Sequence, residues 1–93
     1  MLFRSVLIVD TYREIDDPVA LFRNIVPALK PHGRVGVIDF TPGAGGPGPA
    51  PDRRVAPELV IKAATAAGLQ LLTREAIVPF QFLLVFGKRP ATS

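Results

Sequence analysis

Two apolar runs of this chain each end in an aspartate, and two hydroxyl-bearing residues follow the first aspartate. Asp10, Thr11 and Tyr12 come directly after the run VLIV, and Asp39 closes the run RVGVI. Short runs of Val, Ile and Leu predict strands buried on both faces, and two such strands joined by a helix form a parallel βαβ unit. Open α/β sheets bind ligands at the carboxyl ends of their strands. These carboxylate, hydroxyl and phenol groups are therefore the candidate binding or catalytic residues.

The helices and strands that must position these groups can be predicted from the spacing of apolar residues and from the residues that start and end helices. Strands are predicted at 6–9 and 34–40, and a helix begins at the aspartate pair before Pro18, because aspartate caps helices and proline suits the first helical position. Pro27 predicts a kink or an early end of this helix, and the turn 30–33 separates it from the second strand. One apolar helix face is formed at helical spacing by Leu21, Phe22, Ile25, Val26 and Leu29.

A loop rich in proline and glycine at 42–51 contains the spacing G-x-G-x-x-G at Gly43, Gly45 and Gly48. In a dinucleotide-binding loop, a helix opens on the third glycine so that its amide hydrogens face a phosphate. The prolines interleaved with these glycines lack those hydrogens, and no helix can begin before about residue 52. We interpret this segment as a flexible loop and not as a phosphate site.

The remainder of the chain predicts one more helix and a hairpin. The helix runs from residue 55 or 57 to residue 67, where Gly68 ends it. Residues 69–78 and 80–87 predict two strands, and the connection at Pro79 is so short that they must be antiparallel. The predicted order is strand, helix, strand, helix, strand, strand, which defines an α/β fold.

Composition favours one small globular domain over residues 1–93, with a frayed tail at 88–93. Hydrophobic residues make up 48% of the chain and charged residues 20%, which argues against disorder. No cysteine is present and His32 is the single histidine, so we expect no metal centre. The longest apolar stretch is too short to span a bilayer, and no signal peptide is visible, so a cytoplasmic location without membrane contact is expected.

The charge pattern does not favour a nucleic-acid partner. The net charge of +3 comes from 11 basic and 8 acidic residues, and the basic ones are scattered. Nucleic-acid binders usually gather such charges on one face with aromatic residues between them. Here only Arg53 with Arg54 and Lys88 with Arg89 are adjacent, and we expect both pairs to be solvated surface.

The predicted order leaves one face of the sheet without a helix. Right-handed crossovers in a sheet that grows in one direction place both helices on the same face. The strand sequences nonetheless predict burial on both faces. We therefore expect something outside this sequence to cover the second face, either further residues or a partner chain.

Three segments resemble the catalytic domain of class I S-adenosylmethionine-dependent methyltransferases: residues 10–18 (DTYREIDDP), 29–39 (LKPHGRVGVID) and 66–69 (AAGL). In that family the fourth strand ends in a polar or acidic residue, and a Leu-Lys-Pro-Gly-Gly type turn leads into the fifth strand. A later helix ends Ala-Gly-Phe before an antiparallel hairpin. The resemblance covers residues 3–88 and implies the C-terminal half of a Rossmann-like methyltransferase fold.

The resemblance also implies roles for the candidate residues. Tyr12 and Arg13 are expected to be catalytic, Asp10 and Thr11 to contact the cofactor S-adenosylmethionine, and Asp39 to lie on the side of a small-molecule methyl acceptor. The family's glycine-rich cofactor turn and its ribose-binding acid precede the fourth strand and have no counterpart in this sequence. We therefore expect the chain alone to bind S-adenosylmethionine weakly or not at all.

Each candidate also has a purely structural interpretation. Asp10 and Asp39 could cap a helix or bond loop amides, Tyr12 could pack half-buried, and Arg13 could belong to a solvated charged turn. Two functions stay open. The chain is either the substrate-side half of a methyl-transfer site, inactive alone, or a non-enzymatic dimerisation or partner-binding module derived from a methyltransferase. The expected partner is a missing N-terminal half or a second copy.

Overall fold

The computed structural model describes residues 2–9, 12–41, 54–77 and 80–89. The glycine-rich loop 42–51, together with Asp10 and Thr11, lies outside the described residues. In chain order the elements are β1 (Phe3–Val9), the 3₁₀ turn η1 (Tyr12–Glu14), α1 (Pro18–Ile25), the 3₁₀ turn η2 (Val26–Ala28), β2 (Leu29–Phe40), α2 (Pro57–Ala66), β3 (Leu69–Ile77) and β4 (Gln81–Lys88).

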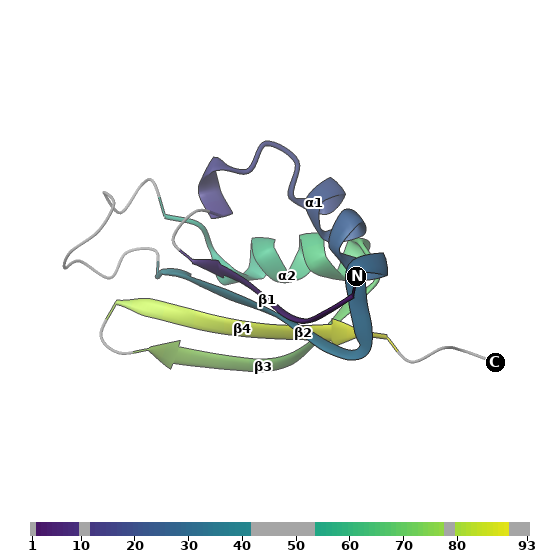
Figure 1. Cartoon of the computed structure of the whole chain (residues 1–93). Helices are drawn as coiled ribbons and strands as arrows, with labels where there is room; N and C mark the ends of the chain where they lie inside the picture. Colours follow the sequence, from purple (N-terminus) through teal and green to yellow (C-terminus); the bar gives the residue numbers. More distant parts are fainter. Residues whose placement is uncertain (1, 10–11, 42–53, 78–79, 90–93) are drawn as a thin grey trace.

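The four strands form one mixed sheet in the order β1-β2-β4-β3. β1 and β2 are parallel, whereas β4 is antiparallel to both of its neighbours, β2 and β3. Both helices lie on the same side of this sheet (Figure 1). The predicted order, the parallel βαβ unit, the antiparallel hairpin and the one-sided helix layer are confirmed. In the described part of the chain, no helix is long and apolar enough to cross a membrane.

Helix α1 begins and ends where its sequence predicts. The Asp17 side chain accepts a hydrogen bond of 3.0 Å from the backbone N–H of Ala20, and Pro18 occupies the first turn. The α-helix ends at Ile25 and continues as η2, which contains Pro27. Proline cannot donate the hydrogen bond that an α-helix requires there, so the early end is confirmed.

Strand β2 begins at Leu29, so the prediction of a turn over 30–33 and of a strand that starts only at residue 34 is wrong. Leu29 is extended, with φ −86° and ψ 142°, and Pro31 disfavours helical geometry at Lys30. At the position of the predicted turn, the pairing of β1 with β2 is irregular: the register shifts between the pairs Phe3–Leu29 and Ser5–Arg34. A Cβ at Gly33 would lie 3.0 Å from the backbone carbonyl oxygens of Phe3 and Lys30, so a larger residue there would require the backbone to shift.

The second half of the chain also follows the prediction. Helix α2 starts at Pro57, and Gly68 follows its end with φ 100°, a conformation that glycine adopts without strain. β3 and β4 then pair in antiparallel register from Leu69 opposite Lys88 to Ile77 opposite Gln81.

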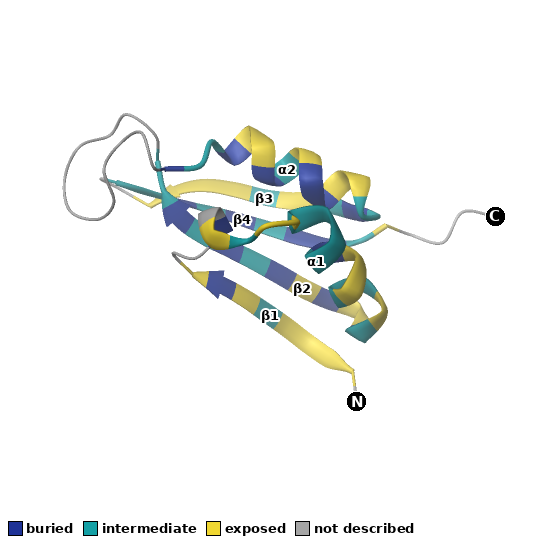
Figure 2. Ribbon diagram, turned by 90° about the horizontal axis from the view of Figure 1, so that it is seen from above, coloured by how far each residue is buried: buried dark blue, intermediate teal, exposed yellow. Residues whose placement is uncertain are grey.

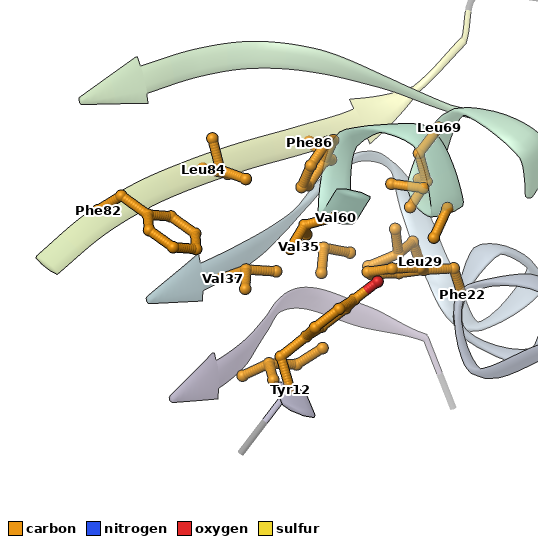
Figure 3. Packing of buried hydrophobic residues seen from close by; sticks show 13 residues of the cluster. Tyr12, Phe22, Leu29, Val35, Val37, Val60, Leu69, Phe82, Leu84 and Phe86 are labelled. Atoms are coloured by element: carbon orange, nitrogen blue, oxygen red, sulfur yellow. The ribbon is translucent and has the colours of Figure 1, made fainter. Parts of the chain in front are cut away.

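The core lies between the helix layer and the sheet face that the helices cover (Figure 3). Alternate residues of β2 and β4 point into it, which produces the alternating burial along these strands (Figure 2). The largest side chains with no appreciable exposure are Phe22, Phe86, Leu29, Leu69, Leu84, Val35, Val37 and Val60.

No described segment covers the opposite face, which we call the open face, and its apolar side chains are partly in solvent. On β1, Leu7 is 63% exposed and Val9 42%, and on β3 Leu72 is 43% exposed. Leu7 lies over Gly36 of β2, because a Cβ at that glycine would be only 3.0 Å from the leucine Cδ1. The strands thus have the apolar composition of a two-sided sheet while the described residues cover one side.

Two leucines of contrasting environment provide a test of this arrangement. Leu84→Ala removes a fully buried side chain, and we expect it to lower the free energy of unfolding by about 2–5 kcal/mol. Leu59→Ala, at a position 58% exposed, should change it by less than about 0.5 kcal/mol. Urea denaturation followed by circular dichroism measures both. Equal losses for the two variants would contradict the assigned core.

Candidate functional site

The candidate site lies at the sheet edge where β1 and β2 end. The parallel register pairs Val9 with Ile38, so the segment after β1 and the end of β2 reach the same edge. Tyr12 starts the turn η1 just beyond β1, and Asp39 is the penultimate residue of β2. The structure therefore places these two predicted residues at one edge, as open α/β sheets place their ligand-binding groups.

Tyr12 is part of the hydrophobic core. Its residue is only 4% exposed, and its ring lies 6.1 Å from the Phe22 ring at an interplanar angle of 33°. Phe22 in turn lies 6.1 Å from Phe86 of β4. The Tyr12 ring extends from the sheet edge toward Phe22 and Leu29 (Figure 3). This packing fixes the position of η1 relative to both α1 and the sheet.

Burial determines which proton chemistry the Tyr12 phenol can perform. Removal from water disfavours the phenolate and raises the pKa of Tyr12 from 10.0 to about 12. The group is therefore neutral near pH 7 and can exchange hydrogen bonds with a ligand, but it cannot act as a general base there.

The remaining predicted residues at this edge are described only in part. The backbone of Arg13 belongs to η1. Asp10 and Thr11, which the resemblance assigns to the cofactor, lie outside the described residues. Their roles stay predictions.

Asp39 is a buried carboxylate, with 5% of the residue exposed. Its Oδ1 accepts a hydrogen bond of 2.8 Å from the backbone N–H of Phe40. Along β2 its side chain shares the helix-covered face with Val35 and Val37, because alternate residues of a strand point the same way. A carboxylate at this place on a strand is held rigidly by the sheet.

Arg54 is the residue that sequence reasoning missed. We expected it to be solvated surface together with Arg53, but the structure buries it to 7% exposure. Its Nη1 donates a hydrogen bond of 3.3 Å to the carbonyl oxygen of Thr41, and its guanidinium carbon lies 5.2 Å from the centroid of the Phe40 ring. Arg54 thus ties the segment before α2 to the end of β2 through a cation–π contact and a hydrogen bond. Nothing in its local sequence distinguishes it from a surface arginine.

Tyr12 and Arg54 line the same hollow of about 310 Å³ between η1 and α2. The rest of its lining is apolar and consists of Ile15, Pro18, Val55, Leu59 and Ala63. A concave apolar surface with few polar groups binds an apolar small molecule and orients it through those groups. Within the described ranges, no three His, Cys, Asp or Glu side chains gather to hold a metal ion.

Comparisons with known proteins identify the fold. No protein-family model matches the chain, and no curated protein matches it. Solved structures do match: a protein of Sulfolobus solfataricus assigned as a type 11 methyltransferase has a TM-score of 0.80 at 21% identity, over 96% of this chain and 52% of that one. A SAM-dependent methyltransferase from Aquifex aeolicus gives 0.81 at 17% identity, over 88% and 44%. The pyocyanin biosynthetic protein PhzM gives 0.76 at 18%, over 95% and 31%.

These likenesses define the class of fold. The chain has the fold of part of a class I SAM-dependent methyltransferase domain, as its sequence predicts. It spans about half the length, or less, of the structures that it matches.

The phenol of Tyr12 offers a direct test of the site geometry. Tyr12 is the only tyrosine in the chain, so the ultraviolet absorbance of phenolate reports on it alone. We expect its ionisation at a pKa of about 12 in the folded chain and at about 10 after unfolding in urea.

Stability should follow this titration. The folded-state pKa is raised, so the contribution of Tyr12 is complete below pH 10 and is lost as the pH rises toward 12. The difference in unfolding free energy between the native chain and Tyr12→Phe should therefore change across that interval. A titration of the folded chain at the ordinary pKa of tyrosine would refute the buried position of the phenol.

Proposed function

We propose that this chain supplies the substrate-side half of an S-adenosylmethionine-dependent methyl-transfer site and is inactive alone. The observation that carries the proposal is the extent of the structural match, which includes 96% of this chain but only 52% of the Sulfolobus protein. A cytoplasmic location and a small-molecule methyl acceptor are part of the proposal.

For methyl transfer, this half of the site mainly has to hold the methyl acceptor in the right position. The cofactor supplies an electrophilic methyl group on a sulfonium, and the displacement depends mainly on the alignment of the acceptor with that group. A general base is required only where the acceptor must lose a proton. The apolar hollow beside Tyr12 and Arg54 fits the role of holding and orienting an acceptor.

The described residues fit the acceptor better than they fit the whole cofactor. The hollow at the sheet edge has an apolar lining with one phenol and one guanidinium, and the sequence lacks the family's glycine-rich turn. In that family, the turn and the ribose-binding acid supply the cofactor's main polar contacts. Asp10 and Thr11 are proposed to contact only the portion of the cofactor that faces this half.

Calorimetric titration tests the assignment of the two halves. The isolated chain should show no micromolar affinity for S-adenosylmethionine. A chimaera that joins the N-terminal half of the Sulfolobus protein to this chain should bind the cofactor, because the missing contacts are then supplied by that half. Micromolar binding by the isolated chain, or no binding by a folded chimaera, would contradict the proposal.

Within the chimaera, conservative variants separate the sheet edge from the glycine-rich loop. Tyr12→Phe and Asp10→Asn barely alter shape, and we expect each to weaken ligand binding or turnover by about tenfold or more without lowering the melting temperature. The double variant Gly45→Ser and Gly46→Ser should stay within a few-fold of the parent, because a Pro/Gly loop cannot hold groups to catalytic tolerance. The reverse pattern would mean that the site is wrongly assigned.

The alternative function is a non-enzymatic module that dimerises or binds a partner. The exposed leucines of the open face favour it, since monomers rarely expose contiguous apolar surface. Light scattering of the purified chain should then show a species larger than the 10.0 kDa monomer, together with binding of a dye that reports apolar surface. A clean monomer without dye binding would contradict this expectation.

A further inference from the structure

The two polar residues of the hollow between η1 and α2 are also its least exposed residues. Tyr12 is 4% exposed and Arg54 is 7% exposed, whereas Leu59, an apolar residue of the same lining, is 58% exposed. The least exposed side chains of a concave surface form its floor. A molecule that enters the hollow therefore contacts apolar residues at the rim and meets the phenol and the guanidinium at the floor.

The Tyr12 hydroxyl has no hydrogen-bond partner among the residues that the structure describes. Its oxygen is nonetheless not sealed from solvent, although the residue as a whole is buried. Buried tyrosine hydroxyls usually have a partner, because an unpaired polar group removed from water costs free energy. A ligand that lies in the hollow can supply the missing hydrogen-bond acceptor.

The second polar group of the hollow, the Arg54 guanidinium, can only donate hydrogen bonds. Its position is fixed by the bond of 3.3 Å from Nη1 to the Thr41 carbonyl oxygen and by the Phe40 ring, 5.2 Å from the guanidinium carbon. A guanidinium carries five N–H donors in one plane, so it bonds several acceptors at once. Both polar groups of the hollow thus favour a ligand atom that accepts hydrogen bonds.

Charge adds to this preference. Among the described residues that line the hollow, Arg54 is the charged one and no carboxylate is present. Four acidic residues neighbour the lining in sequence, and all four are exposed to solvent: Glu14, Asp16, Asp17 and Glu58. Water and salt screen exposed carboxylates, whereas a buried cation acts on a neighbouring group with less screening. The hollow therefore favours a negatively charged ligand over a neutral or cationic one.

Neither polar group of the hollow can remove a proton from a ligand near pH 7. The pKa of Tyr12 is raised to about 12, so its phenol stays protonated, and the guanidinium of Arg54 does not lose its proton in proteins. A hydroxyl group of ordinary acidity needs a general base before it can act as a nucleophile. A carboxylic acid or an acidic phenol needs none, because it has already lost its proton in solution.

We propose that the hollow binds a small apolar molecule in its oxyanion form, and that the charged oxygen accepts hydrogen bonds from Tyr12 and Arg54. The methyl acceptor is then a carboxylic acid or an acidic phenol. This assignment of the ligand as acceptor rests on the proposed function, whereas the selection of an anion rests on the hollow alone. The hollow of about 310 Å³ lies at the lower end of the range of ligand sites, about 300–1,000 Å³, so the ligand is small.

Three probes with one apolar body test this selection on the full chain: cyclohexanecarboxylate, cyclohexanecarboxamide and cyclohexylmethylammonium. Tyr12 is the only tyrosine and the chain has no tryptophan, so a change in tyrosine fluorescence reports a ligand at this residue. We expect the carboxylate to bind at least about tenfold more tightly than the neutral carboxamide, because hydrogen bonds to a charged group are the stronger ones. The ammonium probe should bind most weakly.

A phenol probe distinguishes the two kinds of acid. The phenolate form of 4-nitrophenol absorbs visible light, and free 4-nitrophenol is partly ionised near neutral pH. Since the hollow binds the anion more tightly than the neutral phenol, addition of the chain at constant pH should increase the fraction of phenolate. The tighter binder of 4-nitrophenol and cyclohexanecarboxylate then identifies which acid the hollow prefers.

Matched variants assign the binding to the floor and the rim of the hollow. Arg54→Gln should reduce the advantage of the carboxylate over the carboxamide to about twofold or less, and Arg54→Lys, which keeps the charge, should retain part of it. Arg23→Gln removes an exposed cation outside the hollow and should leave the advantage unchanged. Leu59→Ala should weaken both probes equally, because it removes apolar contact. Circular dichroism checks that each variant is folded.

Equal affinity of the carboxylate and the carboxamide for the unmodified chain would overturn the proposal, and this comparison needs no variant. Binding of the carboxylate without a change in Tyr12 fluorescence, or with its full advantage in folded Arg54→Gln, would also overturn it, because the anion would then lie elsewhere. The chimaera separates this proposal from the proposed function. If the chain selects the carboxylate but the folded chimaera does not bind S-adenosylmethionine, the anion site stands and the methyl-transfer assignment fails; the reverse result has the opposite meaning.

Discussion

The layer of apolar side chains between the two helices and one sheet face is the constraint on which this structure depends. Phe22 from α1 lies at its centre and contacts Tyr12 on one side and Phe86 on the other, with ring centroids 6.1 Å apart in each case. Because Tyr12 belongs both to this layer and to the candidate site, the packing that stabilises the domain also sets the geometry at the sheet edge. A cavity next to Phe22 would therefore disturb the site as well as stability.

Much of the fold follows from local sequence. Single residues set the ends of both helices: Asp17 caps the start of α1, Pro27 ends it, and Gly68 follows the end of α2. Their effects can be predicted from the sequence without knowledge of tertiary contacts. The start of β2 was not predictable in this way, because Leu29 continues the helical spacing of α1 and only pairing with Phe3 makes it a strand residue. Arg54 was missed for a similar reason: its burial depends on Phe40 and Thr41, which are distant in sequence.

The two ends of the sheet carry different chemistry. At the carboxyl ends of β1 and β2 lie a neutral phenol, a buried carboxylate and an apolar hollow, whereas cations gather where β2 begins. The two regions share no lining residue, and they lie at opposite ends of β2.

The position of β4 in the sheet has a consequence for how the chain folds. This last strand lies between β2 and β3, and it alone joins the parallel β1–β2 pair to β3. During synthesis the ribosome completes both helices and three strands before the residues that connect them exist. The nascent chain must therefore carry its unpaired β2 and β3 edges, together with the apolar residues of the core, until Gln81–Lys88 emerges. Assembly of the four-stranded sheet must therefore wait until β4 has been synthesised, and a truncation ahead of β4 leaves β3 without its partner strand.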